Sequence, residues 1–506
     1  MQPVLINGQW RQAKSSGSFR AENPASGELL ADEFPTSTWA DCDETLNAAA
    51  EAALNLATTP PKQLADFLTR FAARIEARSA ELVEIAHLET ALPKAPRLAE
   101  VELPRTTDQL RQAAAGALDG AWALPVIDAK MNIRSLHAPI GPVLVFGPNN
   151  FPFAYNGVCG GDFAAALAVG NPVIAKAHPL HPKTTELVAR EAFASVTETG
   201  LPAATVQMVY NISPEDGLRM AADPRLGAVG FTGSRSAGLR LKAAADAVGK
   251  PIYLEMSSVN PVVILPGALA ERGDVIATEF TESCLAASGQ FCTNPGLVIL
   301  AAGDGTEKFI AVVAEIFAKA PVVSLLSSDV ARNLLEGIDQ LQKAGAQLLA
   351  GGHPIAGQGA NRFANTLLRV SGKQFLAAPE ALQTEAFGNA SLLVVAADVD
   401  EAIQAVSHLH GNLTGSIYSD TRGSEDGIYT QVAARLRSRV GRLLNDKMPT
   451  GVAVVPAMNH GGPFPATGHA GFTAVGIPAA MRRFTMLQCF DNVRGHRLPL
   501  PLRDKA

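Results

Sequence analysis

The residue with the clearest potential for covalent chemistry is Cys292. It follows the run Ser288-Gly289-Gln290-Phe291 and lies just before an apolar segment expected to form a strand. A thiolate in such a turn can attack an electrophilic carbon. A single cysteine is also commonly a small core residue, so this segment alone is consistent with either role.

Two other segments could supply the polar groups that thiol chemistry needs. Glu255 ends the apolar run 252–254, where its carboxylate is either a backbone cap or a general base. Asn150 lies between prolines in segment 146–152, and an amide on a stiff turn suits the stabilisation of an oxyanion. Asparagine and proline are also ordinary turn formers. Neither segment alone decides between its two roles.

A nucleotide site is indicated by Gly233 and Ser234, which follow the apolar run 228–231 and open an amphipathic segment. Glycine permits a sharp turn, and free N–H groups at the start of a helix can bind a pyrophosphate. The G-x-G-x-x-G pattern of a Rossmann turn does not occur where that turn would need it. A glycine before a helix is common, so this signal is weak by itself.

The elements that must position these residues follow from the spacing of the apolar runs. Short apolar runs alternate with Ala-rich or amphipathic stretches long enough for a crossover helix, the pattern of a doubly wound parallel sheet. The pattern occurs twice, so we predict an α/β protein with two doubly wound units and a boundary near residue 255. The expected strands are 143–146, 173–175, 206–209 and 228–231 in the first unit, and 261–264, 297–300, 347–349, 392–395 and 414–418 in the second.

Other segments lie outside these series. Residues 62–77 carry apolar side chains at helical spacing, and a second helix is expected to begin with Ser79 as its N-cap. Segments 121–140 and 481–492 fit neither unit and are expected to be isolated strands. Because isolated strands need a partner sheet, we predict a small β arm that pairs with another subunit.

The composition limits the function classes. The chain has 506 residues, 47% of them hydrophobic, and a net charge of −6. These values suit two or three folded domains and give no reason to expect nucleic acid or a membrane as a partner. The five cysteines are few and widely spread, so we expect neither a disulfide framework nor a metal site. With no signal-peptide pattern and no apolar run of about 20 residues, we expect a cytoplasmic protein.

Together these segments resemble, in order and spacing, the aldehyde dehydrogenase superfamily, and the resemblance covers nearly the whole chain. It implies that Cys292, Glu255 and Asn150 form the catalytic set. It also implies an NAD(P)+ cofactor, whose nicotinamide ribose would be held by a glutamate. The cofactor-binding residues expected from the matching motifs are Phe146, Gly147, Lys176, His178, Gly233, Ser234, Glu385 and Phe387.

The resemblance further implies a reaction and a domain division. The Cys292 thiolate attacks an aldehyde, and the Asn150 amide and the Cys292 backbone N–H stabilise the oxyanion. A hydride leaves for the nicotinamide, and Glu255 activates the water that hydrolyses the thioester. We expect a homodimer or homotetramer. The expected division is a dinucleotide-binding domain at 1–120 and 141–255, a catalytic domain at 256–455, and an oligomerisation arm with the C-terminal segment at 121–140 and 456–506.

One departure from the common family pattern concerns the cofactor. The segment Lys176-Ala177-His178-Pro179 lacks the carboxylate with which many members bind the adenosine ribose. Without that negative charge a 2′-phosphate is not repelled, and Lys176 and His178 could favour it. We therefore predict that NADP+ is used at least as well as NAD+. The alternative is that His178 merely precedes a proline turn.

Further departures at 255–261 and 459–467 resemble the branch of 2,5-dioxopentanoate (α-ketoglutaric semialdehyde) dehydrogenases, which implies oxidation to 2-oxoglutarate. NADP-dependent fatty aldehyde dehydrogenases share several of these features and are the alternative. A dioxo acid needs a cation for its carboxylate, and the sequence offers Arg105, Arg134 and Arg442 without choosing among them. The candidates for an apolar substrate tunnel are Phe151, Phe291 and Phe464.

Two rival functions could use the same scaffold. An acyl-transfer enzyme, cofactor-independent or dependent on coenzyme A, would use the same cysteine, but Glu255 beside the thioester favours water as the acceptor. A non-catalytic binding protein is the other rival, since a fold alone does not define a function. The joint presence of Cys292, Glu255 and Asn150 argues against it.

Overall fold

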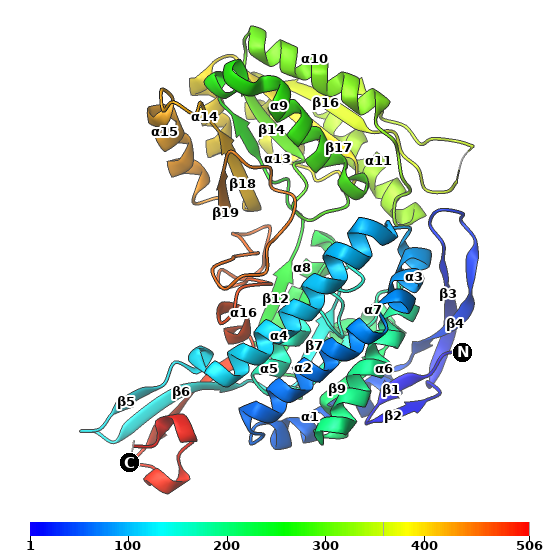
Figure 1. Cartoon of the computed structure of the whole chain (residues 1–506), viewed down its shortest axis with the longest axis vertical. Helices are drawn as coiled ribbons and strands as arrows, with labels where there is room; N and C mark the ends of the chain where they lie inside the picture. The colour runs from blue at the N-terminus through cyan, green and yellow to red at the C-terminus, as the bar shows by residue number, and fades with distance from the viewer. Residues whose placement is uncertain (358, 505–506) are drawn as a thin grey trace.

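Two seven-stranded sheets, each flanked by helices, form the bulk of the computed structural model, which describes residues 1–357 and 359–504. In Figure 1 the first sheet and its helices occupy the lower part of the molecule and the second sheet the upper part. Both sheets are mostly parallel, so the α/β class with two doubly wound sheets is confirmed.

The first sheet has the strand order β12-β11-β7-β8-β9-β1-β2. Its five parallel strands are largely buried, which explains why they are almost entirely apolar. The chain passes from β7 outward through β8 and β9, and β11 then lies on the other side of β7. The strand order therefore reverses between β7 and β11, where doubly wound sheets bind ligands. The strands are β1 (Val4–Ile6), β2 (Gln9–Arg11), β7 (Val143–Phe146), β8 (Val173–Lys176), β9 (Val206–Val209), β11 (Ala228–Thr232) and β12 (Ile252–Glu255).

Helices pack against both faces of this sheet. The helix predicted over 62–77 is confirmed, but Ser79 is the first residue of the next helix and not its cap. The two helices are separated only by Arg78, which makes no side-chain capping bond, so no extended cap residue precedes Ser79. The helices are α1 (Trp39–Leu56), α2 (Pro61–Ala77), α3 (Ser79–Thr90), α4 (Leu103–Asp119), α5 (Gly161–Ala168), α6 (Pro182–Thr199), α7 (Pro214–Ala221) and α8 (Arg235–Asp246).

The second sheet has the order β15-β16-β17-β14-β13-β18-β19. The apolar runs do not predict β16 or β19, and β15 is wrongly expected to continue the parallel series. No helix separates β15 from β16, and the direct connection makes β15 an antiparallel edge strand. The strands are β13 (Val262–Ile264), β14 (Leu297–Ala301), β15 (Gln347–Ala350), β16 (Thr366–Ser371), β17 (Ala390–Ala396), β18 (Asn412–Tyr418) and β19 (Val440–Asn445).

Helices also flank the second sheet, and they form its core with the buried faces of β13, β14 and β17. The long helices α9 and α10 pack against each other, as do α14 and α15. The helices of this part are α9 (Pro266–Leu285), α10 (Asp304–Lys319), α11 (Ser328–Lys343), α12 (Gly372–Ala377), α13 (Pro379–Leu382), α14 (Val399–Ser407) and α15 (Asp426–Leu436).

A three-stranded sheet of β5 (Val126–Asp128), β6 (Ile133–Pro139) and β20 (Thr485–Asp491) projects from the body at the lower left of Figure 1. The expectation that its two segments are isolated strands is wrong, because β6 pairs with β20 over its whole length. Only the tertiary fold brings these distant segments together. Pairing of this arm with another subunit stays a prediction.

The segment 456–478 lies along the edge strand β12. The Met256 N–H donates to the carbonyl of Ala466 at 2.7 Å, and the Gly468 N–H donates to the carbonyl of Leu254 at 3.0 Å. The expected division groups this segment with the arm, but it lies between the two sheets, beside the residues described below. Within residues 1–357 and 359–504, no helix is long and apolar enough to cross a membrane.

Candidate active site

Cys292 follows a tight turn with an unusual backbone. Ala287, Ser288 and Gly289 all have positive φ angles, of 47°, 53° and 67°, in the left-handed region. A Cβ atom on Gly289 would lie 2.1 Å from the carbonyl oxygen of Gly388, so only glycine fits there. This turn places Cys292 a few residues before the amino end of β14.

The backbone at Cys292 is held by Asn260, a buried residue in the loop after β12. The Asn260 Nδ2 donates to the carbonyl oxygens of Cys292 and Asn294, at 2.8 and 2.9 Å. The backbone N–H of Asn260 in turn donates to Oδ1 of Asn412 on β18 at 3.1 Å. These bonds connect the loop after β12 to the cysteine loop, so the two move as one unit.

Glu255 is the last residue of β12, and its side chain is buried. Because β12 is an edge strand, it has room for a partner on its outer side. The segment 456–478 takes that place, and Glu255 forms an antiparallel bridge with Thr467. The bridge brings the preceding part of this segment, including His460, beside the carboxylate.

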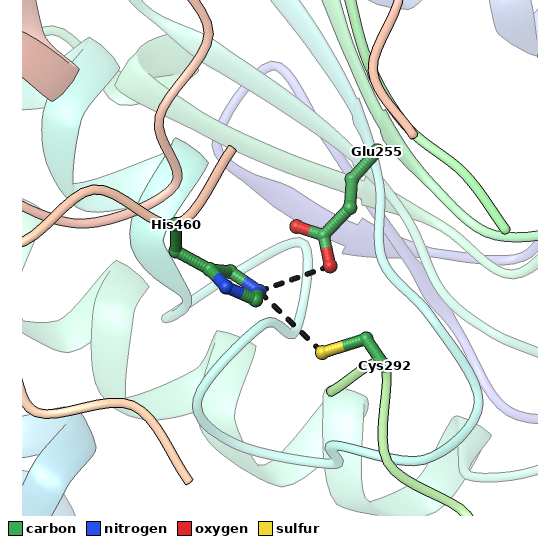
Figure 2. Close-up of side chains that lie close together, drawn as sticks. All are labelled: Glu255, Cys292 and His460. Atoms are coloured by element: carbon green, nitrogen blue, oxygen red, sulfur yellow. Dashed lines mark hydrogen bonds and ion pairs between the residues drawn. The ribbon is translucent and has the colours of Figure 1, made fainter. Parts of the chain in front are cut away.

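His460 lies between Glu255 and Cys292, as Figure 2 shows. Its Nε2 is 3.4 Å from Sγ of Cys292 and 3.0 Å from Oε1 of Glu255. The imidazole is almost fully buried, and the backbone N–H of His460 donates to Oγ1 of Thr473 at 3.0 Å. A single ring nitrogen therefore contacts both the thiol and the carboxylate and can exchange a proton with either.

His460 is not among the residues predicted from the sequence. Segment 459–467 stands out as a departure from the family pattern, but its motif assigns no role to the histidine. A histidine beside Gly461-Gly462 in a segment without strand or helix periodicity is the available signal. That signal does not say which residues the histidine contacts, since 168 positions separate it from Cys292.

Burial raises the pKa of the Cys292 thiol well above its ordinary value, and the negative charge of Glu255 raises it further. The Arg105 guanidinium acts in the opposite direction and lowers the pKa of this thiol. The effect of Arg105 on this pKa is smaller than those of burial and Glu255 together, so the thiol is protonated at neutral pH in this state. A nucleophilic thiolate at Cys292 therefore requires a base, and the contacting group is His460.

A cavity of about 270 Å³ opens beside Cys292 and Glu255. Asn150 also lines it, and its Nδ2 donates to the carbonyl of Gln290 at 2.9 Å. The amide has a second N–H that this bond leaves available. Oε2 of Glu255 has no hydrogen-bond partner among the described residues, so it can hold a water molecule. The remaining lining residues are Pro148, Asn149, Thr232, Gly233, Ser234, Met256, Ser257, Val330, Asn333, Glu385 and Phe387.

Four of the residues expected to bind the cofactor, Gly233, Ser234, Glu385 and Phe387, line this cavity. Ser234 is the N-cap of α8, and its Oγ accepts the N–H of Ala237, which leaves N–H groups of the first turn for an anion. Burial raises the pKa of Glu385 to about 7. An enclosed carboxylate of this kind gains from hydroxyl donors, so a ribose fits beside it.

The other four expected cofactor residues lie at the carboxyl ends of β7 and β8. Phe146 is in register with Lys176, and the ring of Phe146 lies 6.2 Å from that of Phe231. At Gly147 a Cβ atom would lie 2.8 Å from the carbonyl oxygen of Tyr155, so close packing by itself requires this glycine. None of these four residues lines the cavity described above.

Lys176 and His178, the two residues expected to favour a 2′-phosphate, differ from each other in charge. Burial lowers the pKa of Lys176 to about 8, which leaves the ammonium mostly protonated at neutral pH. Burial lowers the pKa of His178 well below its ordinary value, and its Nδ1 accepts the N–H of Leu180 at 3.2 Å. His178 is therefore neutral, and it can offer a 2′-phosphate an N–H donor but no charge.

Two of the three tunnel candidates contact each other. The rings of Phe151 and Phe291 meet edge to face with centroids 5.7 Å apart. Phe464 is 58% exposed, lies beside the Arg235 guanidinium and is not among the residues that line the cavity. Its place in a substrate tunnel stays a prediction. The carbonyls of residues 463 and 464 pack against Gly411, which leaves the Phe464 ring facing outward.

The side chains of Cys292, His460 and Glu255 also form a set of metal donors. A sulfur, a nitrogen and an oxygen atom of Cys292, His460 and Glu255 lie within 4.8 Å of one another. Zn²⁺ prefers such donors, and a bound Zn²⁺ would coordinate the Cys292 sulfur and keep it from reacting with an aldehyde. The wide spacing of the cysteines along the chain, from which we expected no metal site, gives no sign that these three residues lie together. Assays of the chain therefore need a chelator.

Known proteins resemble this chain in sequence and in fold. The sequence profile of the aldehyde dehydrogenase family matches residues 10–479. The chain is 39% identical to alpha-ketoglutaric semialdehyde dehydrogenase 2 of Azospirillum brasilense, over 99% of this chain and 96% of that protein. It is 33% identical to the alpha-ketoglutaric semialdehyde dehydrogenase of Acinetobacter baylyi, over 99% and 95%.

Solved structures share the fold at lower sequence identity. Aldehyde dehydrogenase C of Pseudomonas syringae, crystallised with NAD+ and octanal, matches with a TM-score of 0.83 at 21% identity, over 97% of this chain and 96% of that one. PnpE of Pseudomonas sp. WBC-3 also matches with a TM-score of 0.83 at 21% identity, over 97% of both chains. At this identity the likeness concerns the fold alone.

Proposed function

The chain belongs to the aldehyde dehydrogenase family, and we propose that this NAD(P)+-dependent enzyme oxidises 2,5-dioxopentanoate to 2-oxoglutarate through a thioester on Cys292. The observation that carries the proposal is the contact of one imidazole nitrogen with both Cys292 and Glu255 beside the cavity. The site thus combines a nucleophile, a proton acceptor and a carboxylate that can activate water.

In the first step His460 accepts the thiol proton of Cys292. The transfer is short, since Sγ and Nε2 are 3.4 Å apart. Oε1 of Glu255, 3.0 Å from the same nitrogen, accepts a hydrogen bond from the imidazolium, which keeps the proton, so Glu255 stays a carboxylate and remains available as the base of the later hydrolysis. The thiolate attacks the aldehyde carbon as the proton leaves the sulfur.

Asn150 and the backbone N–H of Cys292 stabilise the oxyanion that this attack creates. The Asn150 amide lines the cavity, and its bond to the carbonyl of Gln290 fixes its orientation. Donors held in place before the reaction need no reorganisation when negative charge develops on the aldehyde oxygen. The second N–H of Asn150 supplies one such donor.

Glu255 then serves the hydrolysis of the thioester. Its Oε2 has no partner among the described residues and can bind a water molecule in the cavity. The carboxylate accepts a proton from this water as the oxygen attacks the thioester carbon. The carboxylic acid leaves, the Cys292 sulfur takes back the proton held by His460, and Glu255 releases the proton of the water to solvent.

NAD(P)+ supplies the oxidant of the reaction by accepting a hydride. The residues fit the cofactor: Gly233 and Ser234 offer a helix start at the point where the strand order reverses, and Glu385 lies across the cavity from them. Lys176 lies in register with Phe146 at the end of β8 and carries a positive charge. With no carboxylate beside it, we propose that NADP+ is bound at least as well as NAD+.

The substrate proposal is supported by two relatives that are named alpha-ketoglutaric semialdehyde dehydrogenases and are matched over 99% of this chain. The test is kcat/KM of the purified chain, with EDTA present, for 2,5-dioxopentanoate, pentanal and octanal. We expect the dioxo acid to be the best substrate and 2-oxoglutarate to be the product. Preference for octanal would support the fatty aldehyde alternative, and acyl-CoA formation without free acid would support acyl transfer.

We also propose that the arm mediates dimer or tetramer formation. Large apolar side chains are exposed on it, and β20 is an edge strand. Such a surface is a site for a second copy of the chain. Light scattering of the purified protein tests the oligomeric state, and a monomer would contradict this proposal. The exposed apolar residues of the arm are Val126, Ile127, Met131, Ile133, Met486 and Leu487.

A further inference from the structure

Arg105 is a cation near the nucleophile that has no carboxylate partner among the described residues. It lies in the first turn of α4, and its side chain is only partly accessible. Its NH2 group donates to the hydroxyl of Tyr155 at 2.8 Å, and its Nε is enclosed without a partner. A guanidinium has five N–H donors and is stabilised by an anion when it is withdrawn from water.

The neighbours of Arg105 connect it directly to the catalytic set. The guanidinium lies over the ring of Tyr155, 4.9 Å from its centroid, and the same ring lies 5.7 Å from that of His460. The positive charge of Arg105 also lowers the pKa of the Cys292 thiol. The rings of Tyr155 and His460 thus connect Arg105 to the reacting sulfur.

Three other arginines differ from Arg105 in their acceptors. Arg442 donates to the carbonyls of Pro449 and Gly451. Arg134 lies in the arm, where it pairs with Asp504 at 3.0 Å. Arg97 lies over the ring of Phe151 and forms an ion pair with Glu102. The Nε of each is unpartnered, as in Arg105, but among these four arginines Arg105 alone donates to neither a carboxylate nor a backbone carbonyl of the described residues.

Burial raises the pKa of Tyr155, so its hydroxyl keeps its proton. That hydroxyl accepts the bond from Arg105, and its own proton remains to be donated. A carboxylate beside the guanidinium could therefore accept hydrogen bonds from both Arg105 and Tyr155. The aromatic rings around them exclude water, which strengthens a charge-assisted bond.

We propose that Arg105, with the Tyr155 hydroxyl, binds the carboxylate of the substrate while its aldehyde reaches Cys292, so that Arg105 selects ω-semialdehyde acids over neutral aldehydes. This inference rests on the proposed aldehyde oxidation at Cys292. It gives the chain a specificity residue on α4, an element that carries none of the groups assigned to the chemistry itself.

The test compares Arg105→Gln and Arg105→Lys with the wild type, using 2,5-dioxopentanoate and pentanal as substrates. Loss of one partner of a desolvated charge pair costs roughly 30- to 5000-fold in binding. We expect Arg105→Gln to lower kcat/KM for the dioxo acid by about this factor and to change that for pentanal less than about threefold. Arg105→Lys should recover part of the loss, because the charge is kept but the bidentate geometry is not.

Arg111→Gln is the matched control, since Arg111 lies on the same helix and pairs only with exposed Glu76. Equal losses for both substrates, or no loss for either, would overturn the inference. A wild-type enzyme that produces no NAD(P)H from any aldehyde would instead refute the proposed function.

A second measurement does not depend on the variants folding. Glutarate should inhibit the wild-type oxidation of pentanal competitively, and glutaramide, which has the same shape without the charges, should inhibit at least about tenfold less. Equal inhibition by the two compounds would also overturn the inference.

Discussion

The imidazole of His460 contacts the thiol of Cys292, with Nε2 3.4 Å from Sγ, although the two residues are 168 positions apart. The thiol beside it is hard to ionise, because burial and Glu255 raise its pKa. The same nitrogen also contacts Glu255, so the ring that takes the thiol proton lies against the carboxylate that later activates water. The reactivity of Cys292 should therefore depend on His460.

His460→Gln should slow both turnover and alkylation of Cys292. Glutamine cannot accept and pass on the thiol proton, and a positioned base contributes roughly 10²- to 10⁴-fold. We expect kcat to fall by about 10²- to 10³-fold and the iodoacetamide reaction at neutral pH to slow by at least about tenfold. His469→Gln, an exposed change in the same segment, is the control. Unchanged alkylation would show that His460 is not the base.

Glu255→Gln should have opposite effects on reactivity and on turnover. Removing the carboxylate removes a charge that raises the pKa of the Cys292 thiol, so more thiolate is present at neutral pH and alkylation becomes faster. Hydrolysis of the thioester loses its base, and steady-state turnover should fall about 10²- to 10³-fold.

Stopped-flow measurement should then show a burst of about one NAD(P)H per site before slow turnover in the Glu255 variant. Absence of the burst together with slower alkylation would assign Glu255 to the first step. Glu282→Gln, a surface change, should behave like the wild type.

Cys292→Ala should abolish oxidation while leaving cofactor binding within about threefold of the wild type. The thiol is the only group here assigned to attack the aldehyde, and the helix start at Ser234 does not depend on it. NAD(P)H formation and calorimetric titration with NADP+ measure the two properties. Cys489→Ala, which removes an exposed thiol, is the control. Substantial turnover by Cys292→Ala would refute the thioester mechanism.

His178→Glu should reduce the use of NADP+. The wild type has a neutral His178 beside a protonated Lys176, and a new carboxylate would repel a 2′-phosphate while still accepting ribose hydroxyls. We expect kcat/KM for NADP+ to fall at least about tenfold and that for NAD+ to change less than about threefold. His178→Gln adds no charge and serves as the control. A wild-type preference for NAD+ over NADP+ would contradict the cofactor proposal.

Glu385→Gln should stabilise the folded protein at alkaline pH. Burial raises the pKa of Glu385 from 4.5 to about 7, so the folded state holds this proton more tightly than the unfolded state. Stability from this group is therefore lost as the pH rises from 4.5 to 7, by an amount on the order of 2–3 kcal/mol.

We expect Tm of the Glu385→Gln variant to exceed that of the wild type by roughly 2–5 °C at pH 8 and by less at pH 5. Cofactor affinity should fall at the same time, since a ribose partner is weakened. An equal Tm difference at both pH values would show that burial does not raise the pKa of Glu385.

Much of the fold could be predicted from local patterns. The strands β7 and β14 are continuous apolar runs because both faces of their sheets are covered, and α2 has one apolar face. Strand direction at an edge could not be predicted in this way. The run at 347–349 matches an inner strand in composition, but its orientation depends on the connection that follows it, which contains no crossover helix.

For the functional residues too, local patterns predict some features and not others. Cys292, Glu255 and Asn150 each lie next to a strand in a distinctive segment, so their order along the chain predicts a common site. Phe464 also lies in a distinctive segment, but packing of its backbone on Gly411 leaves its ring exposed. A residue type and its neighbours in sequence do not determine which way a side chain faces.

The sequence by itself therefore determined most of the two sheets and predicted a nucleophile with its partners, because periodicity and short motifs are local properties. Only the tertiary structure decided that His460 reaches Cys292 and that Arg105 has no carboxylate partner within residues 1–357 and 359–504. Both facts depend on contacts between distant segments, in which 456–478 lies along the edge of β12 and α4 packs beside Tyr155. Long-range contacts of this kind leave no periodic signal in a single chain.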